Sequence, residues 1–119
     1  MYMILLTQVL RVASHGRLIV PPSRSSAFRF GFNTPANYDD HGKGCVSKVN
    51  CGICGDPPGS RKHEAPGRYA TGTLTGRYKA GQTIKVTTQI TKNHRGTVEF
   101  KLCVNNNFKK DKTQACFDR

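Results

Sequence analysis

Two segments with alternating apolar and polar residues limit the possible folds of this chain more than any other feature. They span residues 82–91 and 97–103, and the loop 92–96 that separates them contains a glycine. A period of two is typical of half-buried antiparallel strands, and such a loop suits a hairpin. The apolar residues that share a face are Ile84, Val86, Ile90, Val98, Phe100 and Leu102. We therefore predict an all-β fold that forms part of a β-sandwich.

The region before these segments has a different character. Residues 15–67 are rich in Gly, Pro, Ser and Asn and show little periodicity. Only residues 17–20 and 27–32 have the composition of short ordered elements. We predict a long irregular loop region, held in place by disulfides, and no helix longer than two turns anywhere in the chain.

Five cysteines in 119 residues point to covalent stabilisation of a small core. Cys103 and Cys116 flank one loop rich in Asn and Lys, and we predict that they pair, which would contribute about 3 kcal/mol. Cys45, Cys51 and Cys54 would then hold one disulfide and one spare thiol, with the pairing open. Together with His63 these three could instead form a Cys3His zinc site, because Cys51 and Cys54 have zinc-knuckle spacing.

The N-terminal residues indicate the compartment. Residues 1–10 are mostly apolar but too short to span a bilayer, and the small residues Val12, Ala13 and Ser14 follow them. We predict a signal peptide over residues 1–14, a secreted protein that begins at His15, and one domain over residues 15–119. A buried N-terminal strand is the alternative. Secretion favours disulfides over free thiols.

The charge of the chain is strongly basic. Lys and Arg number 19 against 7 Asp and Glu, which gives a formal net charge of +12. These charges are scattered, and the sequence has neither a recognition helix nor the aromatic signature of RNA-binding domains. We therefore expect no nucleic-acid partner and no membrane partner.

Two of the histidines could together supply metal ligands. His63-Glu64 begins like a zinc-protease motif, but Gly67 stands where the second histidine is needed. A terminal His15, in contrast, would offer its α-amine and its ring Nδ1 in one chelate. His94, in the loop between the alternating segments, could add a third nitrogen. Three nitrogens in a T-shaped plane suit Cu(II).

Several ordered motifs of the chain resemble the mature N-terminal region of lytic polysaccharide monooxygenases, in particular the animal-type branch, auxiliary-activity family fifteen, within the type-4 chitin-binding domains. The resemblance covers essentially all of residues 15–119. Its motifs are His15-Gly16-Arg17-Leu18, Pro21-Pro22-x-Arg24, Phe28-Arg29-Phe30-Gly31, Asn37-Tyr38, Cys51-Gly-x-Cys54-Gly55-Asp56, His63-Glu64-Ala65, Tyr69-Ala70, Asn93-His94, Cys103-x-Asn105-Asn106-Asn107 and Cys116-Phe117-Asp118-Arg119.

The resemblance implies an immunoglobulin- or fibronectin III-like β-sandwich with a flat copper surface. His15 would supply its amine and Nδ1 and His94 its Nε2, forming a histidine brace for one copper ion, and Tyr38 would stack on a sugar ring. The implied activity is oxidative cleavage of an insoluble β-1,4-linked polysaccharide, chitin first and cellulose second, with an external reductant and O2 or H2O2.

Two departures from the family pattern bear on activity. Family domains continue into further strands and carry an axial Tyr or Phe near the copper, which has no counterpart here; we therefore expect the chain to be a fragment with an incomplete sandwich. Lys92 stands where the family often has a small residue. The alternatives are a non-catalytic chitin-binding module or inactive truncated fragment, and a zinc-stabilised basic protein.

Overall fold

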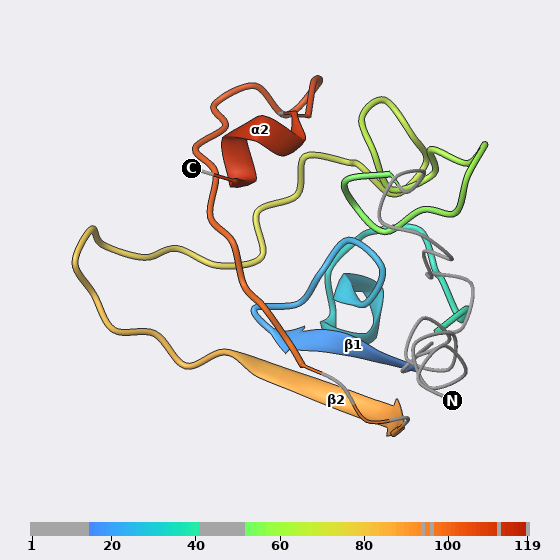
Figure 1. Cartoon of the computed structure of the whole chain (residues 1–119), viewed down its shortest axis with the longest axis horizontal. Helices are drawn as coiled ribbons and strands as arrows, with labels where there is room; N and C mark the ends of the chain where they lie inside the picture. Colours follow the sequence, from blue (N-terminus) through green and yellow to red (C-terminus); the bar gives the residue numbers. More distant parts are fainter. Residues whose placement is uncertain (1–14, 41–51, 94, 96, 112, 119) are drawn as a thin grey trace, which may run out of the picture.

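A computed structural model describes residues 15–40, 52–93, 95, 97–111 and 113–118. Their regular elements are strand β1 (His15–Val20), the 3-10 helix η1 (Ala27–Phe30), strand β2 (Thr87–Lys92) and helix α2 (Gln114–Phe117). Most of the remaining described chain is irregular, and a long excursion before β2 loops away from the sheet (Figure 1). The predicted signal peptide lies outside the described residues.

The two strands form one antiparallel sheet, which joins the beginning of the described chain to a segment about seventy residues later (Figure 1). His15 pairs with Lys92 and Gly16 with Ile90, so the register skips Thr91 between them. Such an irregularity is typical of a β-bulge, which bends a strand and redirects its side chains. The Arg17 guanidinium donates to the Gln89 side chain at 2.8 Å across the sheet.

The predicted hairpin is wrong. Residues 82–86 form no strand, β2 pairs with β1, and residues 97–103 are not assigned to a strand. The apolar side chains of the second segment stay exposed, with Leu102 at 91 % and Phe100 at 59 %. Alternating apolar and polar residues stabilise a strand when another layer covers the apolar face. The described residues supply no second layer to cover the apolar face of residues 97–103. They form a small sheet with extensive loops, and the expected sandwich is not confirmed.

The two short pieces expected in the irregular region are confirmed as β1 and η1, and polar contacts hold η1 beside β1. The Ser26 hydroxyl donates to the carbonyl of Leu18 in β1 and accepts the backbone N–H of Ser23 at 2.9 Å. Ser26 is completely buried, and Ala27 is 1 % exposed. Among the described residues Ala27 is the only buried hydrophobic side chain, whereas the buried polar ones are Ser25, Ser26, Asn37, Asp56, His63 and Glu64. Satisfied polar networks therefore organise the interior.

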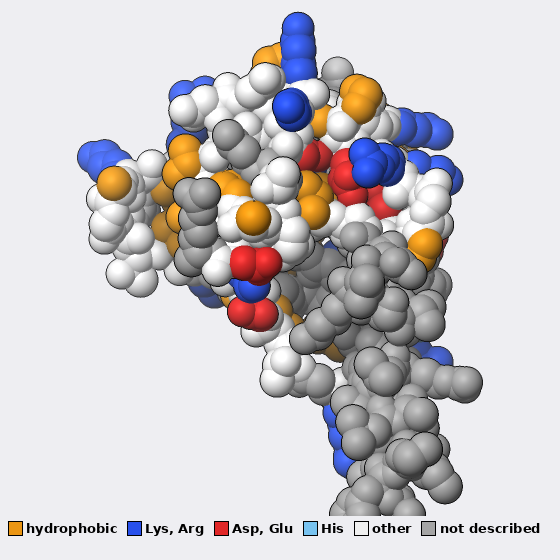
Figure 2. Space-filling view, turned by 45° about the horizontal axis from the view of Figure 1, so that its top comes forward, with side chains coloured by type: hydrophobic (Ala, Val, Ile, Leu, Met, Phe, Trp, Pro, Cys, Tyr) orange, Lys and Arg blue, Asp and Glu red, His pale blue; other side chains and the backbone are white. Residues whose placement is uncertain are grey.

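The surface carries the basic charge expected from the sequence. Lysine and arginine side chains project around the edge of one face, with hydrophobic side chains between them (Figure 2). In the part of the chain that the structure describes, no helix has the length and apolar character needed to cross a bilayer.

Candidate functional site

His15 begins β1, at the end of the sheet where β1 meets the last residue of β2. The side chain is partly exposed, and the backbone pairs with Lys92. Asn93 follows Lys92, and the next residue is His94. His94 lies outside the described residues, as do His41, Cys45 and Cys51. The described pairing therefore brings one predicted ligand next to the strand that leads to the other.

Gly16 makes the close approach of the two strands possible. A Cβ atom built at this position would lie 2.6 Å from the backbone oxygen of Gln89 and 3.4 Å from the Cα of Ile90. Real C···O contacts are longer, at about 3.3 Å or more. Glycine directly after His15 therefore keeps β1 against β2 at the end of the sheet where His15 pairs with Lys92. The imidazole of His15 is a nitrogen donor of the kind that Cu(II) binds, and the second predicted donor, His94, lies outside the described residues.

Tyr38 is presented on the surface, with 76 % of its area exposed. One side of its ring packs against Phe28, with ring centroids 5.1 Å apart and an interplanar angle of 79°. The Arg29 guanidinium lies 5.3 Å from the Tyr38 centroid, and it also contacts Asp40 at 3.7 Å. The ring is thus held in one orientation while most of it remains accessible.

Asn37, which precedes Tyr38, belongs to a buried polar cluster that we define as Asn37, Asp56 and His63, and the partly exposed Tyr69 covers this cluster. The His63 Nδ1 contacts Asp56 Oδ1 at 2.7 Å, and its Nε2 contacts the Asn37 amide nitrogen at 2.9 Å. Tyr69 stacks on the imidazole with centroids 4.6 Å apart. The other Asp56 oxygen accepts the backbone N–H of His63 at 2.7 Å. A tight turn that contains Gly55, with φ of 84°, positions Asp56.

These contacts bear on the zinc alternative. Both ring nitrogens of His63 are engaged, so neither is left for a metal ion. Among the described residues no three His, Cys, Asp or Glu side chains are grouped in a way that could hold a metal. Cys45 and Cys51 fall outside that set, but without His63 the predicted Cys3His arrangement lacks its nitrogen ligand.

A second polar centre joins three distant segments through Arg24. Its guanidinium binds Asp111 through two hydrogen bonds of 2.8 and 3.0 Å and donates to the His63 carbonyl at 2.6 Å. The hydrogen bonds from Arg24 lower the pKa of Asp111 below its usual value, and the hydrogen bond to Asp111 raises the pKa of Arg24. Asp111 also accepts the backbone N–H of Ala65. The pair therefore ties the C-terminal segment to the loop that carries His63.

The described cysteines agree with part of the predicted pattern. Cys103 and Cys116 form a disulfide, with their Cα atoms 5.7 Å apart. Cys54 is a free thiol beside Arg24, whose guanidinium donates to its sulfur at 3.4 Å. Burial raises the pKa of Cys54 to about 11, although the charge of Arg24 opposes the shift. At neutral pH the group is therefore a protonated, unreactive thiol.

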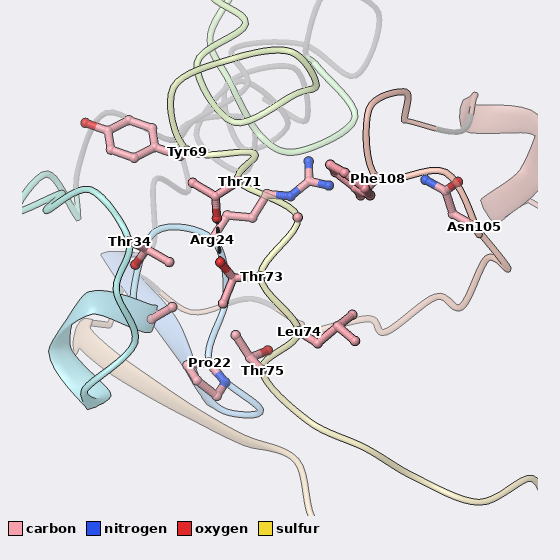
Figure 3. A pocket seen from close by; sticks show the side chains of 12 residues that line it. Pro22, Arg24, Thr34, Tyr69, Thr71, Thr73, Leu74, Thr75, Asn105 and Phe108 are labelled. Carbon is pink, nitrogen blue, oxygen red and sulfur yellow. Dashed lines mark hydrogen bonds between the residues drawn. The ribbon is translucent and has the colours of Figure 1, made fainter.

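Three pockets lie near these clusters. One, of about 330 Å³, is lined by Arg24, three threonines at alternate positions and Phe108 (Figure 3), and it includes none of the residues predicted to act. Another, of about 360 Å³, lies between β1 and the residues Arg24, Cys54 and His63. The smallest of the three, of about 170 Å³, is polar and is lined by Asn37 and Asp39, which flank Tyr38, together with members of the buried polar cluster.

Sequence reasoning did not find the buried polar cluster. Asn37 is 26 residues from His63, and no periodicity connects it with Asp56 and His63. The available signal was the density of polar residues around glycine turns in a segment with too few apolar residues to build a core.

Two comparisons found known proteins that are similar to this chain. The sequence model of the family described as "Lytic polysaccharide mono-oxygenase, cellulose-degrading" matches residues 15–119. A solved structure, the AA15 lytic polysaccharide monooxygenase from Thermobia domestica in the Cu(I) state, is similar at 37 % identity and a TM-score of 0.75. The similarity covers 87 % of this chain but only 59 % of that one. No protein with curated annotation matches the chain.

Proposed function

Because the chain belongs to the lytic polysaccharide monooxygenase family, in its AA15 branch, we propose that it takes part in copper-dependent oxidative cleavage of a β-1,4-linked polysaccharide. Chitin is the first proposed substrate and cellulose, named in the family description, the second. The proposed partners are the insoluble polysaccharide, an external reductant, and O2 or H2O2.

One observation carries the proposal: His15 pairs with Lys92, two positions before His94. Two residues span at most about 7 Å of extended chain, so covalent geometry keeps His94 within reach of His15. Cleavage of a signal peptide after Ser14 would release the α-amine of His15. That amine, Nδ1 of His15 and Nε2 of His94 would then hold one copper ion, which is the histidine brace proposed here.

The side chains of this chain bind and orient the reactants. Tyr38, most of whose ring is accessible, would stack on a sugar ring and align the polysaccharide with the metal. Copper held by these residues would supply the redox chemistry by which O2 with two electrons and two protons, or H2O2, replaces a C–H bond at C1 or C4 with C–OH and leaves water. The hydroxylated carbon then eliminates the neighbouring sugar, which breaks the glycosidic bond.

The test measures metal and products separately. The secreted chain should begin His-Gly-Arg-Leu, bind one Cu(II) with a tetragonal electron-spin resonance spectrum, and release oxidised oligosaccharides from β-chitin or cellulose when a reductant is added. His94→Ala, or one extra residue before His15, should abolish both the spectrum and the products. His41→Ala is the matched control and should leave both unchanged. Normal copper binding in His94→Ala would refute the brace.

A non-catalytic binding module is the second candidate, and the coverage of the relative favours it. The chain spans only 59 % of the solved copper protein, and apolar residues such as Leu102 and Val104 are exposed. Loose support around a metal site lowers activity more than binding. Polysaccharide binding with bound copper but no oxidised products would support the module.

A further inference from the structure

Asn37, the residue before Tyr38, is anchored on three sides. Its amide nitrogen contacts His63 Nε2 at 2.9 Å, its Oδ1 accepts the backbone N–H of Asp39 at 3.0 Å, and its carbonyl accepts a hydrogen bond from Arg29 at 3.3 Å. The side chain is buried, with 7 % of its area exposed. The Asp39 contact closes a turn around Tyr38, so the amide of Asn37 fixes the backbone on both sides of the exposed ring.

The hydrogen bonds determine which protons are present. The backbone N–H of Asp39 can only donate, so Oδ1 of Asn37 must accept, and the amide NH2 therefore faces His63. Nε2 of His63 must then be an acceptor without a proton. The ring proton lies on Nδ1, where the carboxylate of Asp56 accepts it. A neutral His63 in this one tautomer satisfies every member of the chain from Asp39 to Asp56.

A proton on Nε2 cannot be accommodated in this arrangement. Nε2–H would point at the Asn37 NH2, which places two donors against each other. Rotation of the amide would relieve this clash but would point the NH2 at the backbone N–H of Asp39 instead. Because the cluster is buried, an unmatched donor at either end is costly. Protonation of His63 therefore loosens the turn that presents Tyr38.

We propose that His63 is a positioning residue that holds Tyr38 in its sugar-stacking orientation through the amide of Asn37. This inference rests on the proposed role of Tyr38 in binding polysaccharide. The inference gives a role to His63, which is not one of the proposed copper ligands. It also makes binding depend on the protonation of Nε2, with the strong-binding state at higher pH.

Several ionisable groups surround His63. Asp56 faces Nδ1, Tyr69 covers one face of the ring, and Arg24 binds the backbone carbonyl of His63. Asp39 and Lys62 line the polar pocket together with the ring. The other ionisable groups packed against this loop are Cys54, Glu64 and Asp111.

Two variants of Asn37 separate positioning from a merely structural role. Asn37→Asp keeps an oxygen for the Asp39 N–H but offers His63 a second oxygen, which accepts a proton from Nε2. A protonated Nε2 then has an acceptor, so binding of this variant to β-chitin or cellulose should not weaken as the pH falls, in contrast to that of the wild type. Asn37→Ala lacks both contacts and should bind about tenfold more weakly throughout. Lys62→Arg, which keeps the positive charge next to His63 and lies outside the hydrogen-bond chain, is the matched control and should keep the wild-type profile.

Nuclear magnetic resonance of the full Cu(I)-loaded chain supplies a readout that needs no polysaccharide. The ring signals of Tyr38 should shift at the same pH at which the ¹⁵N signal of His63 Nε2 reports protonation. A Tyr38 signal that ignores His63, or an Asn37→Asp profile with the wild-type sign, would overturn the inference. If the wild type binds neither polysaccharide at any pH, the proposed function fails, while coupled Tyr38 and His63 signals would still establish the anchor.

Discussion

Gly16→Ala tests whether the close approach of β1 and β2 supports the metal site. The added Cβ would lie 2.6 Å from the Gln89 carbonyl oxygen. An ordinary C···O contact needs about 3.3 Å, so the strands must separate by roughly 0.7 Å. Because the obstacle is backbone, no side-chain rotation relieves it. Overpacking of this kind costs about 1–3 kcal/mol of unfolding free energy.

The same displacement should weaken copper binding, because the residue next to the added methyl group is His15 and the opposite strand leads to His94. A misplacement of about 1 Å at a reacting centre can cost about a hundredfold in rate, so activity should fall further than stability. Cu(II) affinity by calorimetry, the electron-spin resonance spectrum and urea unfolding measure the three effects on one preparation.

Gly81→Ala is the matched control for this experiment. Gly81 has φ of 78°, and no atom lies within 4 Å of the place that a Cβ would take, so alanine there costs only backbone strain, about 1–2 kcal/mol. It should lower stability while leaving copper affinity unchanged. If Gly16→Ala bound Cu(II) as tightly as the wild type with the same spectrum, the proposed link between strand spacing and the metal site would be refuted.

Three further predictions concern the polar centre and the cysteines. Arg24 lowers the pKa of Asp111, so this pair stabilises the fold above the unfolded-state pKa of about 3.9 and its contribution is lost as pH falls through the folded-state value. Asp111→Asn should therefore cost about 1 kcal/mol at pH 7, since Arg24 is 36 % exposed, and much less at pH 3, measured by urea unfolding; equal losses at both pH values would contradict this. Cys54, whose pKa burial raises to about 11, should resist iodoacetamide at pH 8 until urea unfolds the chain, and rapid labelling of the native chain in peptide maps would contradict its burial. Replacing Cys103 and Cys116 by serine should lower the free energy of unfolding by about 3 kcal/mol, and an unchanged urea midpoint would show that the bridge contributes nothing.

The strands show where sequence patterns suffice and where they fail. The alternating segment 82–91 overlaps most of β2 (Thr87–Lys92), and composition located β1 near residues 17–20. The pairing was predicted wrongly because a hairpin is the local solution, whereas β1 reaches β2 across about seventy residues. The period of two in the sequence does not show which of the two segments pairs with β2. Residues 97–103 have strand patterning without a strand, because alternation describes a preference that needs a covering layer to be realised.

Part of the candidate site could be predicted from the sequence and part could not. His15 and His94 were predicted from the chemistry of a terminal histidine and a loop histidine, and Tyr38 from the family resemblance. The structure describes His15 at the start of β1 and Tyr38 on the surface, and their roles stay predictions. The hydrogen-bond chain through Asn37, His63 and Asp56 could not be predicted, because it depends on tertiary contacts between two loops. A histidine followed by a glutamate suggested metal chemistry, but both ring nitrogens of His63 serve the protein itself.

Different interactions hold the loops and the β1–β2 sheet. This difference would give the proposed metal ion a second role. Polar networks around Arg24 and His63 fix the loops, whereas the sheet that carries His15 buries little apolar surface, with Ile90 48 % exposed. Hydrogen bonds contribute only about 1 kcal/mol each, so the end of the sheet near His15 and Lys92 is weakly held. An ion bound by ligands from both strands would bridge that end. Because such an ion binds the folded chain in preference to the unfolded one, it stabilises the pairing that creates its own site. The proposed brace would therefore act as both the reactive centre and the cross-link that the sheet otherwise lacks.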